Sequence, residues 1–73
     1  MKTSRAVPHF RAAENADGTL WIVMEPYSGD NLQVFRESVT IGFDLAPGTT
    51  LEEAQTIAKF MGEKLTGIAE TAP

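Results

Sequence analysis

Cysteine is absent from the sequence, and its absence removes two common ways of stabilising a small chain. The chain has 73 residues and is expected to form one domain, which at this size buries only about 60% of the surface that its unfolded chain exposes. Small proteins compensate with disulfides, a bound metal or a partner chain. Disulfides and thiolate metal sites need cysteine, and with His9 as the single histidine we expect no structural zinc. A partner chain remains, so we predict self-association as a homodimer or contact with another protein.

Long apolar runs are also missing. No run approaches the roughly 18 residues that a membrane span requires, and no apolar segment follows Lys2 and Arg5, so a secretory signal is not expected. The apolar share of 42% is nevertheless ordinary for a globular protein. The sequence therefore predicts a folded protein that has no membrane partner and is located in the cytoplasm.

Positive charge is scarce outside the first eleven residues. The net charge is −4, and all ten acidic residues follow Arg11. An acidic body disfavours a broad nucleic-acid surface, because such affinity depends largely on Lys and Arg contacts. Residues 1–8 show no periodicity and end at Pro8, so we predict a flexible basic tail there, followed by a single domain over residues 9–73. Binding of nucleic acid by the arm residues Lys2, Arg5 and Arg11 is an alternative hypothesis.

The segment from Gly48 to Gly67 predicts an amphipathic helix. Thr50 is suited to cap its start and Glu53, three residues later, to complete a capping box. Gly67 suits a left-handed turn at its end, and Gly62 predicts a close backbone approach. One apolar stripe should face a sheet, with Phe60 beside it; the residues of this stripe are Leu51, Ala54, Ile57, Ala58, Met61 and Leu65.

Alternating apolar residues predict the strands of that sheet. Residues 9–14 and 19–25 should form a hairpin around the turn Asn15–Gly18, and Pro26 should end the second strand. Residues 39–45 predict another strand, whereas residues 31–35 fit either a strand or a helical turn. The fold class is therefore α+β, with two layers: an antiparallel sheet of three or four strands (β-β-(β or short helix)-β-α), covered on one face by a single C-terminal helix.

This arrangement assigns apolar side chains to two faces of the sheet. The face toward the helix should hold Leu20, Ile22, Met24, Val39, Ile41, Phe43 and Leu45. Trp21 and Val23 fall on the opposite face, where exposure of large apolar side chains would be costly. We therefore predict a protein interface on that side, formed by Trp21, Val23, Tyr27 and Phe35.

Residues suited to catalysis do not form a recognisable constellation. His9 has no predicted partner for general-base work, and Glu52 and Glu53 are adjacent on a helix, so they do not face each other. The turn before the helix lacks the Lys of a phosphate-binding loop. We therefore predict no enzymatic activity, no metal and no cofactor. A small-ligand pocket between helix and sheet is a weaker hypothesis.

One combination of features resembles a known family. Residues 14–21 (ENADGTLW), Pro26, and Thr50–Leu51–Glu52–Glu53–Ala54 at the start of a helix follow the order of features in HicB-like antitoxins. The resemblance implies a small protein that binds and blocks a toxin and regulates its own operon. From the residues themselves, the leading hypothesis is a small, non-catalytic, bacterial-type module that acts through protein–protein contact. A HicB-like antitoxin or a nucleic-acid-linked regulator is the alternative.

Overall fold

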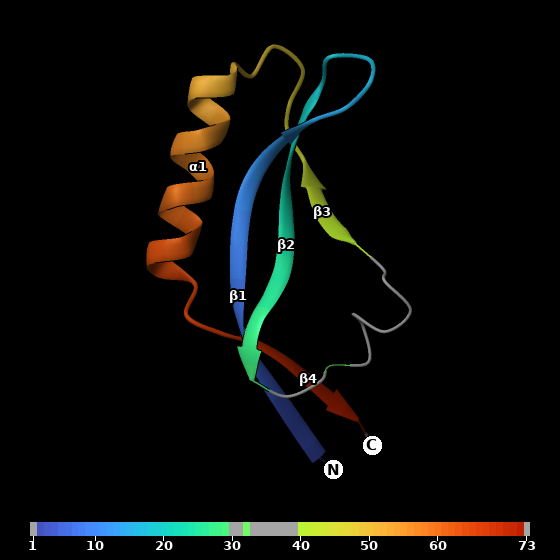
Figure 1. The fold of residues 1–73 in the computed structure, drawn as a ribbon, viewed down its shortest axis with the longest axis vertical. Helices are drawn as coiled ribbons and strands as arrows, with labels where there is room; N and C mark the ends of the chain where they lie inside the picture. The colour runs from blue at the N-terminus through green and yellow to red at the C-terminus, as the bar shows by residue number, and fades with distance from the viewer. Residues whose placement is uncertain (1, 30–31, 33–39, 73) are drawn as a thin grey trace.

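Among the residues that the structure describes, four strands and one helix form the fold, in the order β1 (Lys2–Glu14), β2 (Leu20–Gly29), β3 (Ile41–Asp44), α1 (Leu51–Lys64) and β4 (Ile68–Ala72) (Figure 1). The computed structural model describes residues 2–29, 32 and 40–72. The strands form one sheet in the order β3-β2-β1-β4, and each pairing is antiparallel. The predicted α+β class, a four-stranded antiparallel sheet with one helix, is therefore confirmed.

The β1–β2 hairpin follows the sequence prediction closely. His9 pairs with Glu25 and Glu14 with Leu20, and the connecting turn has Gly18 at φ 88°, a conformation that glycine adopts without steric cost. The Asp17 carboxylate accepts hydrogen bonds from the Thr19 N–H at 2.9 Å and from the Thr19 hydroxyl at 2.6 Å. These bonds fix the turn, because a short acidic side chain here satisfies backbone groups that the hairpin leaves unpaired.

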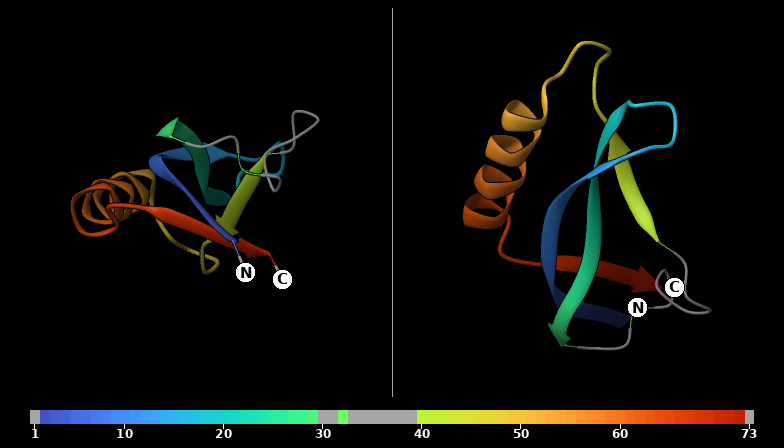
Figure 2. Two further views of the ribbon diagram at one scale, coloured as in Figure 1. Left: turned by 90° about the horizontal axis from the view of Figure 1, so that it is seen from below. Right: turned by 45° about the horizontal axis from the view of Figure 1, so that its top comes forward.

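The prediction of a tail over residues 1–8 is wrong for the described residues 2–8, which form the first half of β1. Lys2 pairs with Ala72 and Ala6 with Ile68, so the start of β1 and the whole of β4 form one antiparallel ladder (Figure 2). The Thr3 and Thr71 hydroxyls add a hydrogen bond of 3.0 Å across it. Strand β4 itself was not predicted, because its sequence IAETA is poor in strand-forming residues and its conformation depends on pairing with the far end of the chain.

Two prolines lie inside strands, where the sequence predicted a break at Pro26. Pro8 pairs with Pro26, and the register shifts between Val7 and Pro8. The outer strands do not extend to these prolines, because β4 pairs with β1 only as far as Ala6, and β3 pairs with β2 only as far as Met24. A missing N–H is tolerated there because proline in a sheet is compatible with bulges and with positions that lack an outer neighbour. Strand β2 therefore continues to Gly29.

The helix begins as predicted and ends differently. The Thr50 hydroxyl accepts a hydrogen bond from the Glu53 N–H at 3.1 Å, and the Glu53 carboxylate accepts one from the Thr50 N–H at 3.0 Å, which confirms the capping box. At the other end Leu65 adopts an extended conformation that leads toward β4, so the predicted left-handed turn at Gly67 is wrong. Gly62 is also not a point of close approach, since no other atom lies within 4 Å of a Cβ placed there.

The core lies between α1 and the β1–β2 hairpin. Leu20 and Ile22 of β2 pack against Ala54 and Ala58 of the helix, so the predicted inward face of β2 is confirmed at these two strand positions. The helix contacts β1 most and β2 less. Around this core lie partly buried apolar side chains, namely Phe10, Ala12, Leu45 and Met61.

The edge strand β3 extends beyond the area that the helix covers. Phe43 pairs with Ile22 and so projects from the helix side of the sheet, yet it remains 45% exposed. Its predicted burial is wrong because the helix lies over β1 and β2 rather than over β3. Ile41 is half-buried. Val39 and the ambiguous segment 31–35 lie outside the described residues, apart from Leu32, which is buried.

The capping box makes the stability of the helix depend on pH. The hydrogen bond from the Thr50 backbone N–H is the main cause that holds the pKa of Glu53 below its ordinary value of 4.5. The hydrogen bond with the Thr50 side chain lowers this pKa further, by a smaller amount. A native pKa below the unfolded one stabilises the protein at higher pH, and this contribution is lost as the pH falls through the native value. We therefore expect the thermal midpoint, followed by circular dichroism, to fall between about pH 5 and pH 3.

Glu53→Gln provides the control for this pH dependence, because glutamine retains the capping geometry without titrating. The thermal midpoint of the variant should change less over the same pH range. Part of the change should remain, since hydrogen bonds from the Thr19 side chain and backbone also lower the pKa of Asp17. An identical pH profile in the variant and the parent would exclude Glu53 as a source of the acid sensitivity.

Candidate interaction surface

Trp21 lies on the sheet face opposite the helix, as the strand alternation predicted. It is half-buried, and it is not part of the cluster beneath α1. Its indole lies directly against Gly42 of β3, because a Cβ placed on Gly42 would overlap ring atoms Cε3 and Cζ3. The indole is therefore partly covered by its own chain through a neighbour that has no side chain.

Among the other predicted interface residues, the structure describes the side chain of Val23. Val23 shares the face of Trp21 but is only 1% exposed, so its side chain is not available on the surface. Tyr27 lies in β2, and Phe35 lies outside the described residues. Of the predicted contact residues whose side chains the structure describes, only Trp21 is therefore partly exposed on this face.

The contact between Trp21 and Gly42 leads to a testable prediction. Gly42→Ala should displace the indole, since the new methyl group would also lie 3.0 Å from the Ile22 carbonyl oxygen and has little space to relax. We expect a loss of about 1–3 kcal/mol in the free energy of unfolding. Trp21 is the only tryptophan, so its fluorescence emission should shift to the red in the native state. Unchanged emission together with unchanged stability would contradict this packing.

The basic residues of the alternative hypothesis do not gather on one surface. Lys2 and Arg5 lie three positions apart in β1 and so project from opposite faces of the strand. Arg11 lies in the hairpin half of β1, where its guanidinium pairs with the Glu25 carboxylate at 3.0 Å. A groove for a phosphate backbone needs cations that point in the same direction, and Lys2 does not share the face of Arg5.

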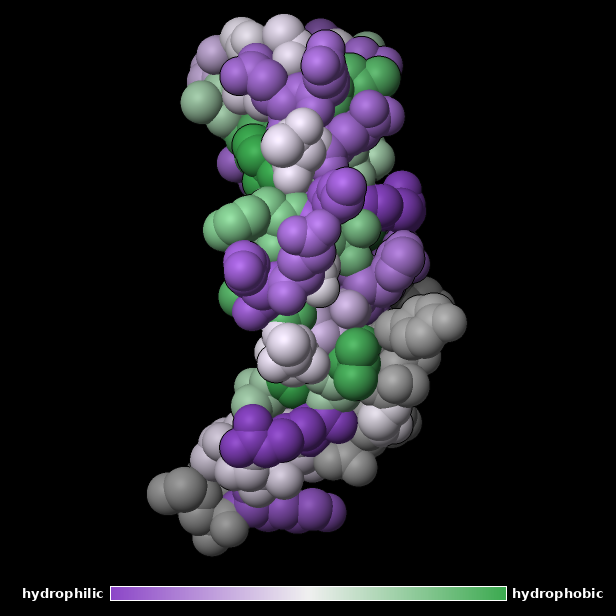
Figure 3. Space-filling model, turned by 90° about the vertical axis from the view of Figure 1, so that its left-hand side faces the viewer, coloured by the Kyte–Doolittle hydropathy of each residue, from purple (hydrophilic) through white to green (hydrophobic). Residues whose placement is uncertain are grey.

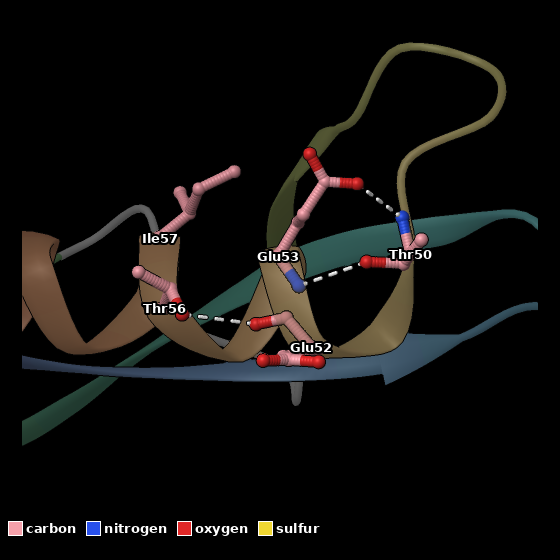
Figure 4. A pocket seen from close by; sticks show the side chains of 5 residues that line it. All are labelled: Thr50, Glu52, Glu53, Thr56 and Ile57. Atoms are coloured by element: carbon pink, nitrogen blue, oxygen red, sulfur yellow. Dashed lines mark hydrogen bonds between the residues drawn. The ribbon is translucent and has the colours of Figure 1, made fainter.

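Other kinds of site find little support among the described residues. Over residues 2–29, 32 and 40–72 no group of three His, Asp or Glu side chains could hold a metal ion. In the same residues no helix is long and apolar enough to cross a bilayer. A hollow of about 590 Å³ is lined by Thr50, Glu52, Glu53, Thr56 and Ile57. These are residues of the helix and its N-cap, so the hollow differs from the predicted ligand pocket between helix and sheet (Figure 4).

The helix exposes most of its large apolar side chains, and here the sequence prediction is corrected. Of the predicted stripe, Ala54 and Ala58 are buried and Met61 is partly buried against the core. The small size of the two alanines lets the helix lie close to the hairpin, and Ile57 and Phe60 are left on one flank of the helix. Exposed fractions are between 37% and 60% for the four apolar residues Leu51, Ile57, Phe60 and Leu65.

Four residues on one side of the helix form what we call the outer stripe: Glu53, Ile57, Phe60 and Lys64. Their spacings are four, three and four residues, which places them in a single row along a helix. All four are exposed. Among the described residues, Phe60 is the most exposed large apolar side chain, at 60%. Glu53 and Ile57 project to the same side of α1, away from Glu52 (Figure 4). On the helix side of the molecule, hydrophobic surface lies between hydrophilic side chains (Figure 3).

The sequence contains a signal that could have identified this stripe. Apolar residues between Leu51 and Leu65 occupy too wide an arc of the helix for all of them to contact one sheet face. The pair of alanines four residues apart marks the side of closest approach. Ile57 and Phe60, three residues apart, are then displaced from it. Helical periodicity alone groups Ile57 with the alanines, whereas the packing places it with Phe60.

Comparisons of the chain with protein-family models, with curated proteins and with solved structures find no match. The resemblance to HicB-like antitoxins therefore depends only on the hairpin and helix-start residues described above.

Proposed function

We propose that this protein is a small, non-catalytic protein-interaction module that associates with itself, in a bacterial-type cytoplasm. One observation carries the proposal: α1 packs on the sheet through alanines and leaves Ile57 and Phe60 on the surface. Glu53 and Lys64, the charged ends of the outer stripe, lie on this same side of α1. The proposed contact surface is therefore α1, in place of the Trp21 face.

Ile57 and Phe60 form an adjacent pair of exposed apolar side chains on α1. Full burial of a side chain such as Phe or Ile is favourable by about 1.5–3 kcal/mol relative to exposure. Single exposed apolar residues are normal on monomers, but Ile57 and Phe60 are neighbours on successive turns of one helix. A domain of 73 residues gains little stability from its own core. Burial of this pair against another chain would therefore add substantially to the stability of the folded protein.

The proposal predicts a reversible increase in mass with concentration. Each chain contributes one helix face, so the interface should fall below the roughly 1,200 Å² of a standard-size complex. We therefore expect a weak dimer, with a Kd on the order of 10–100 μM. Sedimentation equilibrium with static light scattering over a range of about 5–500 μM, chosen to span that Kd, would measure it. A monomer mass throughout that range would contradict the proposed self-association.

A further inference from the structure

We propose that the outer stripe binds the outer stripe of a second copy of this chain, with the two helices antiparallel. This inference rests on the proposed function and deepens it, because it assigns both the partner and the orientation. Three features of the stripe favour this pairing: its symmetry, the signs of its charges and the shape of the surface beside Ile57.

The stripe is symmetric about its own midpoint. Ile57 and Phe60 lie equally far from the middle of the row, and Glu53 and Lys64 lie equally far beyond them. In a two-fold symmetric contact each residue meets the same partner in both directions. An axis through the midpoint therefore places Ile57 against Phe60 of the second copy and Glu53 against Lys64 of the second copy, each contact occurring twice.

The charges distinguish this orientation from a parallel one. Glu53 lies in the first turn of α1 and Lys64 in the last. Antiparallel helices bring opposite charges together at both ends of the apolar pair, whereas parallel helices in register would place Glu53 near Glu53 and Lys64 near Lys64. Like charges in juxtaposition disfavour an interface, and complementary ones fix its register.

The surface next to Ile57 can accept an aromatic side chain. In helix pairing of this kind a side chain inserts between four residues of the facing helix. Glu53, Thr56, Ile57 and Phe60 are spaced to form such a set, and the first three line the hollow of about 590 Å³ beside the helix start. Phe60 of the second copy would enter it. The Glu53 carboxylate remains able to pair there, because the Thr50 N–H binds its Oε1 and the other oxygen points away from the helix (Figure 4).

A mixing experiment with two charge-reversal variants tests this pairing. Glu53→Lys and Lys64→Glu each place like charges at both ends of the contact, so each variant alone should dimerise about tenfold more weakly than the parent. Mixed in equal amounts, the two variants should form a heterodimer with near-parental affinity, because each end again joins opposite charges. Sedimentation equilibrium measures all three affinities, and circular dichroism confirms that each variant is folded.

Matched phenylalanine variants keep the test decisive if the Glu53→Lys change, which removes half of the capping box, prevents folding. Phe60→Ser should weaken dimerisation at least about tenfold, whereas Phe43→Ser, which removes an exposed phenylalanine from β3, should leave it unchanged. A parent chain that is always monomeric overturns both this inference and the proposed function. A parent dimer that survives Phe60→Ser, or variants that recover nothing on mixing, overturns the inference alone and leaves self-association through another surface.

Discussion

Ile22→Ala is expected to lower the free energy of unfolding by about 2–5 kcal/mol. Ile22 has no exposed surface and packs in the cluster with Leu20, Ala54 and Ala58, so truncation leaves a cavity bounded by the helix and the hairpin. The two alanines that face this position are too small to fill it. Urea denaturation followed by circular dichroism measures the loss, and an effect near the upper limit would leave the variant unfolded without denaturant.

Phe43→Ala is the matched control for this prediction. Phe43 is the cross-strand partner of Ile22, but it is 45% exposed and lies outside the area covered by the helix. Its truncation should cost no more than about 1 kcal/mol, the range of a cross-strand pair. All variants are compared at one low protein concentration, because self-association would add to apparent stability. Equal losses at the two positions would contradict the location of the core.

Gly29→Ala is expected to lower the free energy of unfolding by about 2–4 kcal/mol, through two effects that act together. Gly29 has φ 118°, in a region that residues with a side chain rarely adopt. A Cβ there would also lie 2.7 Å from the Ala6 Cα and 2.7 Å from the Arg5 carbonyl oxygen. Both contacts are with backbone, so relief requires β1 and β2 to separate at the point where β1 also pairs with β4.

Gly18→Ala separates these two effects. Gly18 has a positive φ of 88°, and no other atom lies within 4 Å of a Cβ placed on it, so the substitution changes backbone strain without a steric clash. Its cost should be about 1 kcal/mol, clearly less than at Gly29. Urea denaturation of both variants measures the difference. A loss at Gly29 no larger than that at Gly18 would show that the strands do not approach each other so closely there.

Features encoded by neighbouring residues could be predicted from the sequence. The helix start depends on two side chains three positions apart, Thr50 and Glu53, and their capping box forms as expected. The hairpin turn likewise depends on Asp17 and Gly18, whose conformations are set within a few residues. In both cases the hydrogen bonds that determine the structure are local, so the sequence pattern carries enough information.

Features that depend on distant residues could not be predicted in this way. Strand β4 contains mainly residues with low strand propensity and exists through its pairing with Lys2–Ala6 at the other end of the chain. For the same reason residues 2–8 looked like a tail when considered alone. Pro26 predicted a strand end, but the effect of a proline depends on whether an outer strand needs its N–H, and this is a property of the sheet.

The candidate surface was only partly predictable. Strand alternation predicts the position of Trp21 on the face opposite the helix, but the cover that Gly42 and β3 provide depends on strand register. On α1 the apolar residues were all assigned to the sheet, because periodicity shows which residues share a side and not how much of that side the sheet covers. Burial of Ala54 and Ala58 in preference to Ile57 is decided by how closely the two layers approach.

Distances between spin labels in the dimer, measured by double electron–electron resonance, test for antiparallel pairing through the outer stripe. The chain has no cysteine, so Glu52→Cys and Lys59→Cys each introduce a unique label site, and both sites lie away from the stripe on the same side of α1. With a rise of 1.5 Å per residue, the two labels at position 52 should be separated along the helices by about 20 Å, and those at position 59 by about 2 Å. Antiparallel pairing therefore requires a clearly longer distance at position 52 than at position 59, and equal distances at the two positions would rule it out.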